Sequence, residues 1–173
     1  HYYDARWHVD STNIDVHATT GTVSTTDAGQ PNLAITGVPL HPLQTFTRSV
    51  EYDPEDISLN HGYRYTRQSS AVPTTTISHV QDNVQDTEFF TFIEHLDTGQ
   101  SSRVSSVEVV SATNARIHFV DGSYYEVTLK AGDGLQVEHV DGAQTLFSLD
   151  SSVDLVDLPA PVGVVAAAIR HDS

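Results

Sequence analysis

The chain of 173 residues contains no cysteine and no methionine, and it has only one lysine and one tryptophan. The absence of cysteine excludes disulfide bonds and thiolate metal ligands. No stretch reaches the about 18 consecutive apolar residues of a membrane-spanning helix, and no signal peptide is visible. Because the chain begins at His1 without an initiator methionine, we expect a processed product or a fragment of a longer protein.

Positive charge is also scarce. Aspartate and glutamate number 23 against eight lysines and arginines, which gives a formal net charge of −15. A field of this sign repels nucleic acid and anionic membranes, so we expect neither as a partner. Acid-rich, lysine-poor surfaces suit high salt, because at 1 M the Debye length is only about 3 Å and self-repulsion is screened. The composition therefore favours a halophilic source.

The strongest pattern is β structure between Glu88 and Leu149. Apolar and polar residues alternate there with the period of half-buried strands, and glycine-containing turns separate the runs. The pattern predicts one uninterrupted meander. Its strands are expected at Glu88–Leu96, Val104–Ala112, Ala115–Val120, Ser123–Leu129, Leu135–Val140 and Ala143–Leu149.

The register of one hairpin can be predicted from its apolar face. A three-residue loop ending at Gly122 places Ile117 opposite Tyr125 and Ala115 opposite Val127, whereas a two-residue loop would mix the two faces. This loop is the turn-plus-bulge type, which needs a residue in the left-handed conformation that glycine adopts freely.

The next hairpin has a similar turn sequence. A three-residue loop ending at Gly142 would bring Val137 opposite Thr145 and Leu135 opposite Phe147. We therefore expect the same turn in both hairpins.

The rest of the chain contains shorter β signals and no helical stripe. Trp7 is the expected core anchor of the first strand, Ser69–Thr76 is expected to be a loop, and Pro159–Ser173 has no clear assignment. These features predict an all-β single domain over 1–173, an antiparallel, jelly-roll-like β-sandwich with a C-terminal meander of hairpins. Its further strands are expected at Tyr2–Val9, Asn13–Thr19, around Val23, and at Leu33–Val38, Phe46–Tyr52, His61–Thr66, Thr76–Val80 and Val153–Leu158.

The run His61–Arg67 is the most distinctive candidate site. On a strand, its alternate residues His61, Tyr63, Tyr65 and Arg67 share one face. Two aromatic rings between a histidine and an arginine suit a sugar ring that carries an acidic group, because the arginine fork matches carboxylates and sulfates. The other interpretation is a structural strand whose tyrosines cover the edge of the core.

The histidines are scattered. His8 with Asp10, and His17 with Asp15, can share a strand face, where a carboxylate could orient an imidazole. His95, His118 and His139 differ in alternation, so a three-histidine metal site is not expected.

Copper binding by His1, with His8 or another histidine completing the site, is a further alternative. No nucleophile elbow, phosphate loop or zinc-protease motif is present. Apart from this copper alternative, we expect the protein to bind no cofactor and no metal.

Several segments together resemble the C-terminal β-sandwich of heparinase II/III-like polysaccharide lyases. They are the run Trp7–Asp10, the strand His61–Tyr65, the proline-bearing loop through Pro73, the apolar strand Phe89–Ile93 and the hairpin Asn114–Leu129. In that family a helical toroid supplies much of the cleft, including a catalytic tyrosine and histidine, and the β region packs beside it and helps to form the substrate groove.

The resemblance implies an accessory module of an acidic-polysaccharide lyase, because this chain contains no toroid sequence. Its partners would be the acidic polysaccharide and a catalytic toroid domain or partner chain, in an extracellular or periplasmic location. No catalytic residue is transferred. The expected groove contacts are His8, His61, Tyr63, Arg64, Tyr65 and Arg67. The alternatives are a stand-alone structural or adhesive extracellular domain and a copper-dependent enzyme.

Overall fold

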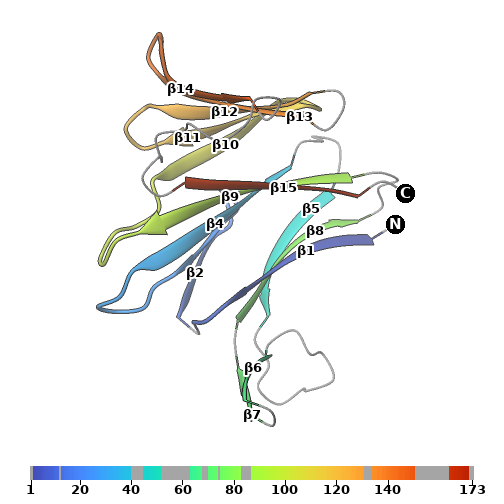
Figure 1. Cartoon of the computed structure of the whole chain (residues 1–173), viewed down its shortest axis with the longest axis vertical. Coiled ribbons are helices and arrows are strands. Elements are labelled where there is room, and N and C mark those ends of the chain that lie inside the picture. Colours follow the sequence, from blue (N-terminus) through green and yellow to red (C-terminus); the bar gives the residue numbers. More distant parts are fainter. Residues whose placement is uncertain are drawn as a thin grey trace.

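A computed structural model describes residues 2–11, 13–39, 45–51, 63–67, 70–73, 75–82, 87–130, 134–150 and 164–171. This part of the chain forms strands and no helix (Figure 1). The strands are β1 (Tyr2–Val9), β2 (Ile14–His17), β3 (Thr22–Thr25), β4 (Asn32–Pro39), β5 (Thr45–Glu51), β6 (Tyr63–Arg67), β7 (Ser70–Pro73), β8 (Thr75–Asp82), β9 (Thr87–Leu96), β10 (Val104–Ser111), β11 (Asn114–Phe119), β12 (Tyr124–Lys130), β13 (Gly134–Asp141), β14 (Gln144–Asp150) and β15 (Val164–His171).

The strands form three packed sheets and one separate hairpin, all with antiparallel pairing (Figure 1). The outer sheet has the order β1-β8-β5, the central sheet β15-β9-β4-β3-β2, and the meander sheet β10-β11-β12-β13-β14. Strands β6 and β7 pair only with each other. The predicted antiparallel β-sandwich is therefore confirmed.

Two hydrophobic clusters hold the three layers together. One joins Phe90 and Phe92 of the central sheet to Ile117 and Tyr125 of the meander sheet. The other joins Ile35 of the central sheet to residues of the outer sheet, including Ile77. The central sheet therefore contributes buried residues from both of its faces. Trp7, the predicted anchor of β1, is partly buried and packs against the second cluster.

The meander is shorter by one strand than the sequence predicted. β9, predicted as its first strand, lies instead in the central sheet between β4 and β15. The reason is visible in the run Phe89–Ile93, which is apolar at nearly every position and so suits a strand covered on both faces. The meander sheet itself begins at β10.

The predicted register of the β11–β12 hairpin is confirmed. Ala115 pairs with Val127 and Ile117 with Tyr125, and the Phe119 amide donates to the Ser123 carbonyl at 2.9 Å across the three-residue loop. Gly122 has a φ of 90°, in the left-handed region where a side chain is strained. All four of the paired residues are buried, so the apolar face does fix the register.

The predicted register of the β13–β14 hairpin is wrong. Asp141 pairs with Gln144 across a two-residue turn, and Val137 lies opposite Leu149 instead of Thr145. The pairing shifts between His139 and Val140, so that Leu146 is skipped. The shift keeps the apolar pair Val137 and Leu149 together although the turn is shorter by one residue, which is the usual effect of a β-bulge.

Two further segments differ from expectation. The predicted loop Ser69–Thr76 contains β7 and the start of β8, and the unassigned tail contains β15, which pairs with β9 along its whole length. The alanine-rich run in β15 lacks polar alternation, so its sequence gave no strand period to recognise. The predicted strand at Val153–Leu158 lies outside the described residues.

Candidate functional site

The predicted site strand forms β6 and pairs with β7 in a hairpin of its own. Tyr63 pairs with Pro73, Arg64 with Val72 and Tyr65 with Ala71, and the register then shifts so that Arg67 pairs with Ser70. A register shift of this kind is a β-bulge in the backbone of β6. His61 itself lies outside the described residues.

The structure brings His8 close to the base of this hairpin. His8 is exposed on β1, and its Nδ1 lies 3.3 Å from the hydroxyl of Thr76 on β8. β7 leads into β8 with one residue between them, so the hairpin leaves the outer sheet at the end where His8 lies. Figure 1 shows the hairpin extending from the outer sheet, away from the meander sheet. His8 and the β6–β7 hairpin therefore lie at the same end of the outer sheet.

The β6–β7 hairpin also lies in a long stretch of sequence without acidic residues. From Ile57 to Gln81 the sequence contains no aspartate or glutamate, although the chain as a whole carries −15. Arg64 and Arg67 are two of its eight basic residues. This is the longest acid-free stretch in the sequence, two residues longer than the one at 28–50.

Other histidines have separate surroundings. The predicted pair of His17 and Asp15 is formed, with 3.1 Å between Nε2 and Oδ2, and both side chains are exposed. His118 and His139 lie on opposite faces of the meander sheet, as their alternation predicts: His118 contacts Tyr124, and His139 stacks on Tyr125. Among the described residues no three histidine or acidic side chains come together as a metal site. His1, the proposed copper ligand, lies outside them.

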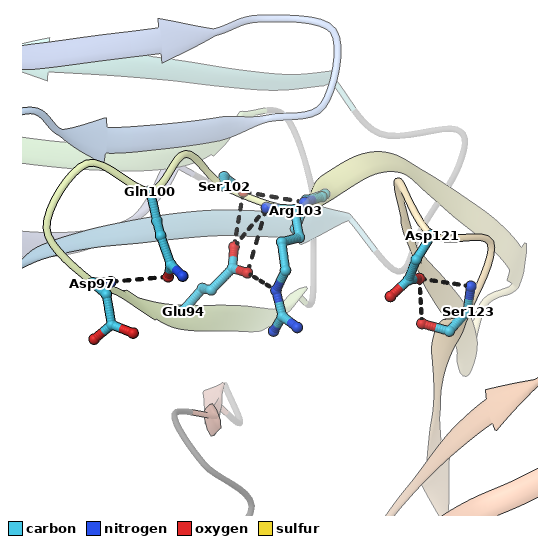
Figure 2. Close-up of polar contacts among 8 residues, drawn as sticks. Glu94, Asp97, Gln100, Ser102, Arg103, Asp121 and Ser123 are labelled. Atoms are coloured by element: carbon cyan, nitrogen blue, oxygen red, sulfur yellow. Dashed lines mark hydrogen bonds and ion pairs between the residues drawn. The ribbon is translucent and has the colours of Figure 1, made fainter.

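A polar cluster that the sequence did not predict surrounds Glu94, at the turn between β9 and β10 (Figure 2). The Arg103 Nε donates to Glu94 Oε1 at 2.8 Å, and the Ser102 hydroxyl donates to Oε2 at 2.9 Å. The Arg103 amide also donates to the carboxylate. The Glu94 side chain is 2% exposed and that of Arg103 is 52% exposed. A buried carboxylate thus fixes a half-exposed guanidinium.

The same guanidinium lies over the ring of Phe119, which is the first of three aromatic rings in contact with one another. The Cζ of Arg103 is 5.3 Å from the centroid of the Phe119 ring, which meets Tyr125 edge-on. Tyr125 and His139 are stacked with their centroids 4.6 Å apart. Burial raises the pKa of the Tyr125 hydroxyl, and the charge of Arg103 opposes this effect. The neighbouring Asp121 has its pKa lowered, chiefly by hydrogen bonds from Ser123.

The outer face of the meander sheet carries a second polar network, centred on Arg116. Its Nε donates to Glu126 at 2.9 Å, and its guanidinium lies 5.3 Å from the centroid of the Tyr124 ring. Glu108 lies 3.0 Å from His118 and 3.8 Å from Arg116. Each of these groups is satisfied by a neighbour on the sheet. The predicted register already places Arg116 opposite Glu126, so this pair of the network follows from the sequence pattern.

Comparison with known proteins adds no relative. The chain matches none of the protein-family models, none of the curated proteins and none of the solved structures with which it was compared. In the part of the chain that the structure describes, no helix is long and apolar enough to cross a membrane.

Proposed function

We propose that this chain is a β-sandwich accessory module of an acidic-polysaccharide lyase, which packs beside a catalytic helical domain and contributes to the substrate groove. The observation that carries the proposal is the β6–β7 hairpin, a separate two-stranded sheet that bears Arg64 and Arg67. It leaves the outer sheet at the end where His8 lies, which supports a shared role for His8 and the hairpin.

Charge supports an anionic ligand at this position. A chain of net charge −15 repels an acidic polymer over most of its surface, so binding requires a region where acidic residues are absent. The hairpin lies in the longest such region. Arginine also offers several donors in a planar fork, which pairs with carboxylate and sulfate groups in two-point contacts.

The remaining residues of the site suit the uncharged part of a sugar. Tyr63 and Tyr65 on β6 supply rings with an apolar body and a polar hydroxyl. His8 supplies a titratable donor at the base of the hairpin. A polymer lying along the hairpin would meet arginine, tyrosine and histidine in turn. The module would then hold the chain while the helical partner supplies the reaction, in an extracellular or periplasmic location.

The test is binding of a uronate-containing or sulfated polysaccharide to the purified chain, with a neutral polysaccharide of similar length as the comparison. The double variant Arg64→Gln/Arg67→Gln should lose most of the affinity for the acidic polymer. Arg116→Gln removes the same kind of charge from the meander sheet and should retain the affinity. Equal binding by both variants, or no binding by the unmodified chain, would contradict the proposal.

A second variant separates ligand contact from folding. Tyr63→Ala should weaken sugar binding while the melting temperature stays close to that of the unmodified chain. A loss of folding without a specific loss of binding would favour the structural interpretation of this strand.

The helical partner is sought by measuring the intact mass of the native protein and identifying any chain that co-purifies with it.

A structural or adhesive extracellular domain is the second candidate function. The outer face of the meander sheet favours it, because Arg116, Tyr124 and Glu126 form an ordered polar surface without any contribution from the hairpin. In this case Arg64→Gln/Arg67→Gln would leave assembly or adhesion intact, and a charge reversal at Arg116 would weaken it. The two candidate functions therefore predict opposite effects for substitutions in the hairpin and at Arg116.

A further inference from the structure

Two hairpin tips of the meander sheet carry the same dipeptide, Asp-Gly. Asp121-Gly122 lies in the loop between β11 and β12, whereas Asp141 is the last residue of β13 and Gly142 begins the turn to β14. All four residues are exposed, and both glycines have positive φ, 90° at Gly122 and 58° at Gly142. The two sites therefore share their sequence and their exposure within one sheet, although one lies in a three-residue loop and the other at a two-residue turn.

The two aspartates differ in their hydrogen bonds. Asp121 Oδ1 accepts from the Ser123 amide at 2.9 Å and from the Ser123 hydroxyl at 2.7 Å, as Figure 2 shows. Asp141 is followed at the same spacing by Ala143, which has no hydroxyl. Within the described part of the chain, the Asp141 side chain makes no hydrogen bond or ion pair. One carboxylate is held in place and the other is free to rotate.

We propose that Asp141-Gly142 is a site of spontaneous aspartate isomerisation, and that the hydrogen bonds from Ser123 protect Asp121-Gly122 from the same reaction. In this reaction the Gly142 amide nitrogen attacks the side-chain Cγ of Asp141, a C–N bond forms, and the carboxyl oxygen leaves as water. The resulting cyclic imide is reopened by one water molecule at either carbonyl. Opening at the backbone carbonyl yields isoaspartate, so the net change is an isomerisation that needs no further reactant.

In both dipeptides the following glycine has no Cβ to hinder approach of its nitrogen to the aspartate Cγ. Two further features make Asp141 the more reactive of the two. The Asp141 carboxyl group is free to turn toward that nitrogen, whereas Oδ1 of Asp121 is bound on the side of Ser123. The acid form of the carboxyl group is also the better electrophile, and the hydrogen bonds to Asp121 favour its ionised form.

The modification would change the sheet at one edge. Isoaspartate adds a methylene group to the main chain, so the turn that pairs Asp141 with Gln144 would no longer fit. β14 is the last strand of the meander sheet and pairs only with β13 in the described structure. Isomerisation would therefore loosen β14 first and leave the β11–β12 hairpin intact.

The test follows oxygen exchange in the folded chain. The purified protein is incubated in heavy-oxygen water at mildly acidic pH and digested, and the label is located by fragmentation mass spectrometry. We expect several-fold more label and isoaspartate at Asp141 than at Asp121. Equal labelling, more labelling at Asp121, or no labelling at either position would overturn the proposal.

A gain of reactivity tests the protective role of Ser123. Ser123→Ala removes the hydroxyl donor, so labelling at Asp121 should rise toward that at Asp141, while labelling at Asp141 should not change. Circular dichroism identifies a variant that has unfolded, in which case the comparison within the unmodified chain decides. An unchanged rate at Asp121 in the folded variant would show that the Ser123 hydroxyl does not protect it.

Discussion

Arg103 and Glu94 form an ion pair in which the two side chains have very different environments. The carboxylate is 2% exposed, the guanidinium is 52% exposed, and their closest nitrogen and oxygen are 2.8 Å apart. Glu94 lies on the central sheet, and Arg103 immediately precedes the first strand of the meander sheet. The pair therefore fixes the crossing between two layers of the sandwich, and a buried charge makes the crossing sensitive to loss of its partner.

Arg103→Ala should lower the free energy of unfolding by about 3 kcal/mol, because it leaves the Glu94 carboxylate buried without a counter-charge. The value lies at the low end of the range for broken buried pairs, since the Ser102 hydroxyl and the backbone amide still donate to Glu94. Urea denaturation measures the change. Glu94→Gln in the Arg103→Ala background should restore part of the loss, and a single variant within about 0.5 kcal/mol of the unmodified chain would contradict this role.

Gly122→Val should destabilise the protein by about 1–3 kcal/mol, because a β-branched residue is strained at a φ of 90°. Crowding does not contribute, since a Cβ built at this position meets no atom within 4 Å. Gly122→Asn is the matched control and should cost less, because asparagine tolerates the left-handed region. Thermal unfolding compares the three chains. Equal melting temperatures for the valine variant and the unmodified chain would refute this register of the loop.

Local patterns predicted much of the meander sheet. The alternation on both sides of Gly122 was sufficient for the pairing of Ile117 with Tyr125, because only one register gives a continuous apolar face. The same reasoning failed at Gly142. There a three-residue loop was expected again, whereas the turn has two residues and β14 skips the exposed Leu146, and no sequence rule marks which residue a strand will skip.

Of the candidate sites, too, one was predicted from a local pattern and the other was missed. The β6 strand was recognised because tyrosine, arginine and histidine alternate within one short run. The ion pair of Glu94 and Arg103 was missed because it joins a strand of the central sheet to the segment that precedes β10, which alternation within one strand does not reveal. The assignment of β9 to the central sheet has the same cause. Long-range packing between layers decides both features, and a single sequence carries little local signal for it.

Glu126 should contribute stability at neutral pH that is lost in acid. Burial raises the pKa of its carboxyl group. Hydrogen bonds from Arg116 and Asn114, together with the charge of Arg116, lower this pKa by more than burial raises it, so the folded-state pKa lies below the ordinary value of 4.5. A carboxyl group with a lowered pKa stabilises the fold above its unfolded-state pKa, and this contribution disappears as pH falls through the folded-state pKa.

The measurement for Glu126 is the difference in melting temperature between the unmodified chain and Glu126→Gln at several pH values. The difference should be largest near neutral pH, begin to shrink below about pH 4.5, and approach a constant minimum in stronger acid. Asp15→Asn is a suitable comparison, because the carboxylate of Asp15 pairs only with an exposed histidine among the described residues. A gap for Glu126→Gln that stays constant or widens in acid would contradict the lowered pKa.

Phe92→Ala should cost about 3–5 kcal/mol of unfolding free energy, the range for removing a large buried aromatic side chain. Phe92 is 2% exposed on the central sheet, and its ring lies 5.8 Å from the centroids of both Phe119 and Tyr125 on the meander sheet. Its removal would leave a cavity between two layers that strand pairing prevents from collapsing. Leu146→Ala, at a side chain that is 57% exposed, should change stability by no more than about 0.5 kcal/mol. A cost below about 1 kcal/mol for Phe92→Ala would mean that the contact between central and meander sheets contributes little to folding, and that the two sheets are held together mainly by the crossing at Arg103.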